Sequence, residues 1–329
     1  MNLKNKRVLV TGADGFIGSH LVEKLIPQVS KVRAFIKYNI FNDIGNLKYI
    51  DKKALKNVEI IFGDIQEQET VRAIIRNIDI VFNLAALISI PYSYQHPQET
   101  IMVNTIGTLN VLTTCKSENV ERIIQTSTSE VYGSALYVPI DEKHPLQGQS
   151  PYSASKIAAD KIAESFYKSY GMKVSIIRPF NTYGPRQSER AVIPTIITQV
   201  LTKDKLILGS TSATRDFNYV EDTAEGFIKI AKSSKSIGEV INIGSGREVS
   251  IGELAKKIMK LCNREVKIVY DKKRFRPKKS EVHRLLADNR KAKKLIGWKP
   301  QFSLEEGLKK TIDWIKNNLE IYHPGEYKL

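Results

Sequence analysis

Short apolar runs alternate with longer amphipathic stretches over the first 180 residues of the chain. The apolar runs have the length of buried strands and lie at residues 7–11, 32–37, 58–62, 78–84, 122–126 and 174–178. Several stretches between them carry apolar residues at helical spacing, near residues 66–77, 98–118 and 150–170. Strands that alternate with helices predict an α/β fold with a doubly wound parallel sheet.

After residue 180 the pattern loosens, and loops rich in proline, glycine, serine and threonine separate the regular segments. Helices are expected near residues 190–203, 221–234, 250–262, 288–296 and 303–319, around short strands at 205–208 and 239–243. We therefore expect residues 1–180 to form the sheet domain and residues 181–329 to form a smaller lobe. The run 239–243 has the composition of another core strand, so the two parts are expected to interleave.

The net charge of +16 raises the question of a nucleic-acid partner. The densest basic run, residues 272–279, has no recognisable nucleic-acid-binding motif around it. We interpret the excess as a solvated basic face that also suits anionic small molecules. No segment approaches about eighteen uncharged apolar residues and no apolar signal core follows Met1, so a cytoplasmic protein without a membrane partner is expected. Two cysteines and five scattered histidines predict neither a disulfide nor a metal site.

A glycine-rich turn directly follows the first predicted strand. Gly12, Gly15 and Gly18 are spaced G-x-x-G-x-x-G, and an amphipathic stretch begins between them with Phe16 and Ile17. The first glycine permits a tight turn, the second lets the backbone approach a diphosphate, and the third lets the helix pack on the strand. The helix N-terminus then faces the anion. This arrangement predicts a Rossmann-type site for a dinucleotide cofactor.

The end of the second strand bears on which dinucleotide binds. An acid there would hold both ribose hydroxyls of NAD, whereas a basic residue favours the 2′-phosphate of NADP. The chain has Lys37 at this place and no acid before Asp43. NADP is therefore favoured over NAD, with a lysine that points to solvent as the alternative interpretation.

Tyr152 and Lys156 lie four residues apart in the predicted helix 150–170, so their side chains share one face. A neighbouring ammonium favours the phenolate and makes a phenol, with an ordinary pKa of about 10, usable as a base. Upstream, Thr128 and Glu130 are two residues apart, and an extended strand would point both into one cleft. The glutamate adds a second base beside the phenol. A site with two bases does more than move a hydride.

Together these motifs make the chain resemble the extended branch of the short-chain dehydrogenases/reductases. The resemblance implies further cofactor contacts in the loops that follow the core strands, from Asp64, Ile65, Leu84, Ala85, Ala86 and Ser127. The set Thr128, Ser129, Glu130, Tyr152 and Lys156 is similar to the catalytic set of nucleotide-sugar 4,6-dehydratases and decarboxylases. Well-known dTDP-glucose dehydratases carry an aspartate where this chain has Ser129, so the acid that assists loss of the C6 hydroxyl stays open.

Segments of the smaller lobe also resemble this group, which implies that the lobe binds a nucleoside-diphosphate sugar. The resemblance assigns substrate contacts to Asn181, Arg186, Val192, Arg215 and Arg276. Arginine suits this role because its planar guanidinium binds phosphate through two parallel hydrogen bonds. A structural ion pair is the alternative for Arg215 and Arg276.

The stretches 150–187, 190–199 and 274–297 look like the 4,6-dehydratases of bacterial legionaminic acid synthesis. This resemblance implies a GDP- or UDP-linked N-acetylglucosamine as substrate and a tightly bound NADP or NAD that is regenerated in every turnover. The resemblance to the extended branch implies a homodimer that pairs through the helices 98–118 and 150–170, with burial of their apolar faces inside a monomer as the alternative. The alternatives are a UDP-glucuronate decarboxylase, a nucleotide-sugar 4-epimerase and, outside the enzymes, a nucleic-acid-binding member of the fold.

Overall fold

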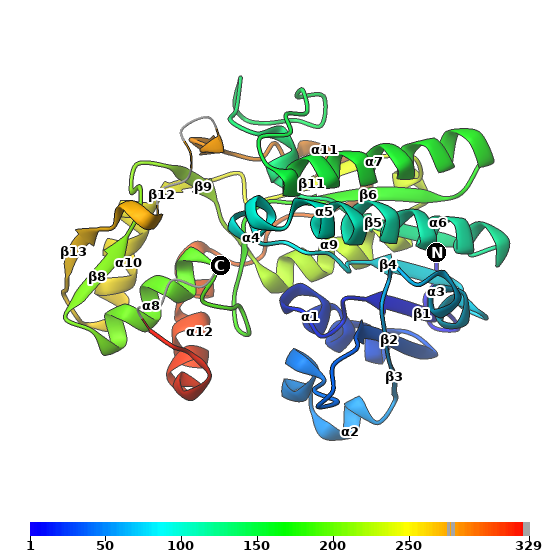
Figure 1. Cartoon of the computed structure of the whole chain (residues 1–329), viewed down its shortest axis with the longest axis horizontal. Coiled ribbons are helices and arrows are strands. Elements are labelled where there is room, and N and C mark those ends of the chain that lie inside the picture. The colour runs from blue at the N-terminus through cyan, green and yellow to red at the C-terminus, as the bar shows by residue number, and fades with distance from the viewer. Residues whose placement is uncertain (275–276, 278–279, 325–329) are drawn as a thin grey trace.

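The computed structural model describes residues 1–274, 277 and 280–324, apart from the side chain of Lys273. Its centre is a seven-stranded sheet in the order β11-β6-β5-β4-β1-β2-β3, in which every neighbouring pair is parallel (Figure 1). The strands are β1 (Arg7–Thr11), β2 (Lys31–Lys37), β3 (Val58–Gly63), β4 (Ile80–Asn83), β5 (Arg122–Thr126), β6 (Val174–Pro179) and β11 (Val240–Ile243). The predicted doubly wound sheet is confirmed, and the run at 239–243 lies at its edge as β11.

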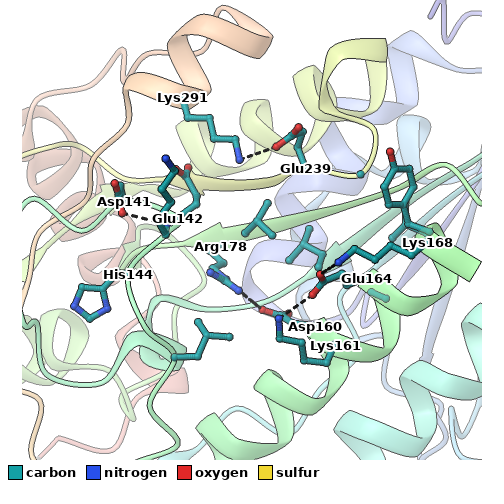
Figure 2. A pocket seen from close by; sticks show the side chains of 18 of the residues that line it. Asp141, Glu142, His144, Asp160, Lys161, Glu164, Lys168, Arg178, Glu239 and Lys291 are labelled. Atoms are coloured by element: carbon teal, nitrogen blue, oxygen red, sulfur yellow. Dashed lines mark hydrogen bonds and ion pairs between the residues drawn. The ribbon is translucent and has the colours of Figure 1, made fainter.

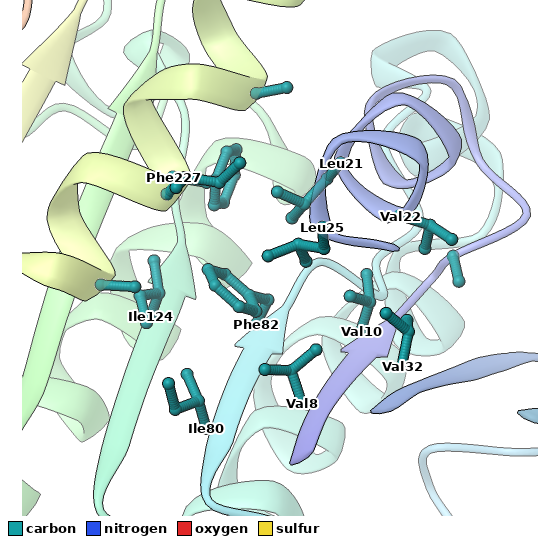
Figure 3. Packing of buried hydrophobic residues seen from close by; sticks show 14 of the residues in the cluster. Val8, Val10, Leu21, Val22, Leu25, Val32, Ile80, Phe82, Ile124 and Phe227 are labelled. Carbon is teal, nitrogen blue, oxygen red and sulfur yellow. The ribbon is translucent and has the colours of Figure 1, made fainter. Parts of the chain in front are cut away.

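Helices cover both faces of this sheet. Successive strand residues point to opposite sides, so the apolar side chains of each strand need burial on both faces. Val8 and Val10 face α1 (Phe16–Leu25) and α9 (Val220–Lys232), as Figure 3 shows, whereas Leu9 faces the opposite layer. That opposite layer consists of α3 (Gln68–Ile75), α6 (Gly107–Ser117) and α7 (Pro151–Tyr170). Strands buried on both sides explain why the sequence shows continuous apolar runs here rather than alternation.

The prediction of one continuous helix over 98–118 is wrong in the middle of that segment. The segment consists of α5 (Pro97–Ile101), a π-helical turn (Met102–Ile106) and α6. Inside the turn, the buried Asn104 amide exchanges hydrogen bonds with the backbone of Leu87 (2.8 and 3.0 Å) and donates to Ser155 Oγ (2.9 Å). The widened turn therefore joins the loop after β4 to helix α7, as such turns often do near functional sites.

The second part of the chain lies beside the sheet, at the left of Figure 1. Its core packs α8 (Val192–Thr202), α10 (Ile251–Cys262) and α12 (Leu304–Lys316) together. Three small sheets surround them, β13-β8, β12-β9-β14 and β10-β7. Their strands are β7 (Thr182–Tyr183), β8 (Lys205–Leu208), β9 (Thr214–Asp216), β10 (Asn218–Tyr219), β12 (Glu248–Ser250), β13 (Lys267–Tyr270) and β14 (Arg284–Leu285).

Shorter helices complete the described chain: η1 (Ile26–Gln28), η2 (Gly45–Tyr49), α2 (Lys52–Leu55), α4 (Ile90–Gln95), η4 (Ser129–Tyr132), η5 (Ser234–Ser236), η6 (Lys272–Arg274), α11 (Arg290–Ile296) and η8 (Leu319–Ile321). Strands of two or three residues, such as β7 and β9, carry too little pattern to be found in the sequence. Within the ranges that the structure describes, no helix combines the length and apolar character needed to span a bilayer. The division of the chain at residue 180 remains a prediction.

Candidate active site

The order of the core strands reverses between β1 and β4, which marks the crevice where doubly wound sheets bind ligands. Gly12 follows β1 with a φ of +64°, a left-handed conformation that favours glycine. A Cβ atom at this position would lie 2.9 Å from the Cα atom of Ala85. The glycine turn and the loop after β4 are therefore in direct contact at the mouth of the crevice.

The N-terminus of α1 opens toward this turn. Gly15 caps the helix and, lacking a side chain, leaves the first backbone amides, at Phe16 and Ile17, without a side-chain acceptor. Gly18 is buried, and a Cβ there would lie 2.2 Å from the carbonyl oxygen of Gly12. Exposed amides at a helix N-terminus and a glycine cradle fit the diphosphate of a dinucleotide.

We expect Gly18→Ala to empty this site. The added methyl group forces α1 away from β1, which should cost about 1–3 kcal/mol of unfolding free energy as an overpacked core does. The nucleotide released by denaturing the purified variant should fall well below the wild-type amount. Gly252→Ala is the matched control, because a Cβ there meets its nearest atom at an ordinary 3.5 Å. Equal nucleotide content in both variants would contradict the assignment.

A chain of buried polar side chains holds the loop after β4 and was missed in the sequence. Thr11 Oγ1 donates to Asn83 Oδ1 (2.7 Å) and accepts from the amides of Leu84 and Ala85 (both 3.0 Å). Asn83 Nδ2 in turn donates to Gln125 Oε1 (2.8 Å), so the chain crosses β1, β4 and β5. The available signal was a polar residue at or near the end of each apolar strand.

The predicted adenosine contacts lie at the ends of β2 and β3. Lys37 is exposed as the last residue of β2, opposite Gly63 in the register. Asp64 follows β3 and its carboxylate accepts the amide of Gln66 (2.9 Å), while Ile65 is buried. These residues lie at the same sheet edge as the glycine turn, and their contacts with a nucleotide remain predictions, as do those of Leu84, Ala85 and Ala86.

Helix α7 supplies Tyr152 and Lys156. Ser150 and Ser153 form a capping box and Pro151 occupies the first turn, so the helix starts at a defined residue. The side chains of Tyr152 and Lys156 are almost fully buried, at 7% and 3% exposed. Both reactive groups therefore lie on the inner face of a well-anchored helix.

Thr128 and Glu130 do not lie on an extended strand, so that part of the prediction is wrong. Strand β5 ends at Thr126, and Thr128 caps the 3-10 turn η4, where its Oγ1 accepts the amide of Glu130 (3.2 Å). The turn still brings both residues to the phenol. Thr128 hydrogen-bonds Tyr152 and lowers its pKa, whereas the charge of Glu130 raises that pKa.

Lys156 has a partner that the sequence did not predict, and its effect on the phenol remains a prediction. Its Nζ donates to the carbonyl oxygen of Thr126 (2.6 Å), and burial raises the pKa of Tyr152 well above its ordinary value. Burial also lowers the pKa of Lys156 to about 8, while the negative charge of Asp160 opposes that shift. In the protein alone, burial thus disfavours the phenolate, because desolvation penalises the charged form.

The two neighbouring serines, Ser127 and Ser129, are both buried. Ser127 donates its hydroxyl to Asp160 Oδ2 (2.7 Å), so the side chain is directed at α7. Ser129 is 3% exposed at the start of η4. The Ser127 hydroxyl thus has a partner on α7, and the cofactor contact of Ser127 and the catalytic role of Ser129 remain predictions.

The predicted substrate residues lie in different surroundings. Asn181 follows β6, and its buried Oδ1 has no hydrogen-bond partner in the described part of the chain, which leaves an acceptor for a ligand hydroxyl. Val192 is the first residue of α8. Arg215 is buried in β9 and lies 3.6 Å from Glu281, which fits the structural alternative. Arg276 lies outside the described residues.

The structure gives Arg186 structural partners through Nη2, whereas its buried Nη1 has no hydrogen-bond partner in the described part of the chain, and its substrate contact remains a prediction. Its guanidinium donates to Glu23 Oε2 on α1 (2.7 Å) and to the carbonyl oxygen of Tyr49 (3.3 Å), with the side chain 8% exposed. Both partners belong to the sheet domain. Arg186 therefore ties the loop after β7 to α1, a long-range contact that sequence similarity could not reveal.

Comparison with known proteins places this arrangement among enzymes of nucleotide-sugar chemistry. Residues 9–311 match the family model described as GDP-mannose 4,6 dehydratase. The human dTDP-D-glucose 4,6-dehydratase is 35% identical over 95% of this chain and 91% of its own length.

Two solved structures are similar over nearly their whole length. The first is the dTDP-glucose 4,6-dehydratase DesIV of Streptomyces venezuelae with NAD bound, with a TM-score of 0.87, 29% identity, and coverage of 96% of this chain and 99% of that one. The second is the UDP-N-acetylglucosamine 4-epimerase of Methanobrevibacter ruminantium M1, with a TM-score of 0.87, 32% identity, and coverage of 96% and 100%.

Proposed function

The chain belongs to the extended short-chain dehydrogenase/reductase family of nucleotide-sugar 4,6-dehydratases and epimerases, and from this premise we propose that it is a 4,6-dehydratase. The proposed reaction converts a nucleoside-diphosphate hexose to the 4-keto-6-deoxy sugar and water. The observation that carries the proposal is the carboxylate of Glu130, which acts electrostatically on the Tyr152 phenol. A 4-epimerase, which oxidises and re-reduces C4, has no use for a second base beside the sugar.

The glycine turn at Gly12 and the open N-terminus of α1 fit a dinucleotide, and NAD is bound in the similar DesIV structure. When bound, the nicotinamide cofactor accepts a hydride from C4 of the sugar and returns it to C6. The basic residue Lys37 at the end of β2 supports a preference for NADP, while its exposure also fits a lysine that points to solvent. The positive charge of the oxidised nicotinamide would also favour the phenolate of Tyr152, which the protein alone disfavours.

The side chains then divide the proton transfers between them. Tyr152 takes the proton of the C4 hydroxyl while Thr128 donates a hydrogen bond to the C4 oxygen. The resulting ketone acidifies the C5 proton, which Glu130 removes. Glu130 hands this proton to the C6 hydroxyl, which leaves as water, and Tyr152 returns its proton to C5. All protons are accounted for within the site, so no exchange with solvent is required.

We propose a GDP- or UDP-linked N-acetylglucosamine as the substrate, as in legionaminic acid synthesis. The similarity to a UDP-N-acetylglucosamine 4-epimerase supports an N-acetylated sugar. The unpartnered Oδ1 of Asn181, at the end of the strand next to β5, supports a polar ligand at this sheet edge. We further propose a homodimer that pairs through the segment 98–118 and α7.

Incubation with UDP- and GDP-N-acetylglucosamine, dTDP-glucose and UDP-glucuronate should give loss of one water from an N-acetylglucosamine nucleotide by mass spectrometry. Release of carbon dioxide from UDP-glucuronate would instead identify a decarboxylase. An isomeric sugar without loss of mass would identify an epimerase. The nucleotide freed by denaturation should be NADP, and NAD alone would overturn that preference.

A further inference from the structure

A chain of buried polar side chains runs behind the catalytic groups and takes no part in the mechanism above. Arg178 on β6 donates to Asp160 Oδ2 on α7 through Nη2 (2.9 Å) and Nε (3.2 Å). Its Nη1 donates to the hydroxyl of Tyr132 (2.9 Å), the last residue of η4. The side chains of Asp160 and Arg178 are 2% and 4% exposed, and the pair is central in Figure 2.

This series of hydrogen-bonded side chains is anchored at both ends. The Tyr132 hydroxyl donates to Asn242 Oδ1 on β11 (2.7 Å), and Asn242 Nδ2 donates to the carbonyl oxygen of Ile140 (3.0 Å). At the other end, Asp160 Oδ2 accepts the hydroxyl of Ser127 (2.7 Å). The connections thus join α7, the end of β5, η4 and two core strands.

The hydrogen-bonded series connects two elements of the candidate active site. Tyr132 closes the same short turn that Thr128 caps and that carries Glu130. Asp160 lies on α7 one helical turn after Lys156 and two turns after Tyr152. The hydrogen bonds therefore connect the element that supplies the proposed C5 base to the element that supplies the proposed C4 base.

Polar contacts add to apolar packing in holding α7 at this point. A cavity of about 580 Å³ lies against it, and Asp160, Ala163, Glu164 and Tyr167 of α7 form one of its walls (Figure 2). Opposite them the wall includes Arg178 and Glu239, from β6 and the segment before β11. Beside the apolar contacts of Ala163 and Phe166 with β6, the Asp160–Arg178 pair links helix and sheet through directed hydrogen bonds at this wall. A buried ion pair is a costly way to gain stability, but its directed hydrogen bonds specify one geometry.

We propose that Asp160, Arg178 and Tyr132 are positioning residues that fix Glu130 on η4 relative to Tyr152 on α7. This inference rests on the proposed function, because it concerns the distance between two bases that act on one sugar. Neither Asp160 nor Tyr132 needs to touch the substrate. Their effect is on the step that requires both bases in place, which is loss of water after oxidation at C4.

Tyr132→Phe is the sharpest test, since it removes the hydroxyl and keeps the ring that packs against Phe180. We expect kcat for water loss from UDP- or GDP-N-acetylglucosamine to fall by about 10–100-fold, as for a misplacement of about 1 Å, with KM within about twofold. Amide hydrogen exchange in residues 130–133 of the holoenzyme should become faster. Arg178→Lys should act in the same direction.

Arg122→Lys is the matched control. Arg122 is another buried arginine, at the start of β5. It donates to Ser175 and Ser236, which lie near the starts of β6 and β11, away from the catalytic edge of the sheet. Arg122→Lys should lower thermal stability. It should leave kcat and the amide hydrogen exchange of residues 130–133 unchanged. If Tyr132→Phe is no worse than this control in both measurements, the positioning role is wrong.

The two hypotheses fail separately in this design. A wild-type enzyme that releases no water from either N-acetylglucosamine nucleotide refutes the proposed function alone. The exchange measurement needs no sugar and then still decides whether Tyr132 holds η4. Faster exchange together with a fall in kcat supports the inference, and unchanged exchange with unchanged kcat overturns it.

Discussion

Replacing Glu130 by glutamine should lower the rate of water loss by about a thousandfold while leaving the oxidation at C4 measurable. Glutamine keeps the size of the side chain and its amide can still pack in η4, but it cannot take the C5 proton. The enzyme should therefore stop after the first step. A single-turnover experiment should show reduced nicotinamide by its absorbance, with little 4-keto-6-deoxy sugar by mass spectrometry.

The control for this experiment is Glu164→Gln. Glu164 is a half-buried carboxylate on α7 that lines the cavity and pairs with Lys161 and Lys168. Loss of such a surface pair costs little, so dehydration should be unchanged. If Glu130→Gln keeps most of the wild-type rate, the C5 base is another group, and the 4-epimerase alternative regains its place.

Tyr152→Phe should abolish the first oxidation, with a loss of about a thousandfold or more in the appearance of reduced nicotinamide. The phenol is 7% exposed and is hydrogen-bonded by Thr128, so phenylalanine fills the same space without a proton acceptor. Because oxidation at C4 precedes every other step, water loss should disappear as well. The two variants thus stop the reaction at different stages.

Tyr167→Phe on the same helix is the matched control for Tyr152→Phe, because its side chain is 37% exposed on the wall of the cavity. It should leave both stages intact. Normal oxidation at C4 by the Tyr152→Phe variant would remove the phenol from the mechanism. That outcome would leave Glu130 as the only proposed base in the site.

The high pKa of Tyr152 in the protein alone has a further meaning for this chemistry. Burial, Glu130 and Asp160 raise the pKa, and the Thr128 hydrogen bond lowers it. In the proposed mechanism, the positive charge of an oxidised nicotinamide would counter the effect of burial and favour the phenolate. This coupling follows from desolvation, which penalises the charged form of any group.

Much of the fold followed from the sequence. The buried core strands on either side of the glycine turn were predicted to within about two residues, because continuous apolar runs and helical spacing are local patterns. The interruption of the helix at 98–118 was not, since it depends on the contact of Asn104 with Leu87 and Ser155. Short strands such as β9 were also not predicted, because they form only through pairing with strands far away in the sequence.

The candidate site divides in the same way. Residue types and spacing alone determined the glycine turn, the pairing of Tyr152 with Lys156 on one helix face and the presence of a carboxylate near them. Only the tertiary structure decided that Thr128 and Glu130 meet the phenol through a 3-10 turn, that Lys156 bonds a carbonyl, and that Arg186 reaches α1. The reason is physical: periodicity and capping act over a few neighbouring residues, whereas burial, pKa values and hydrogen-bond partners depend on segments far apart in the chain.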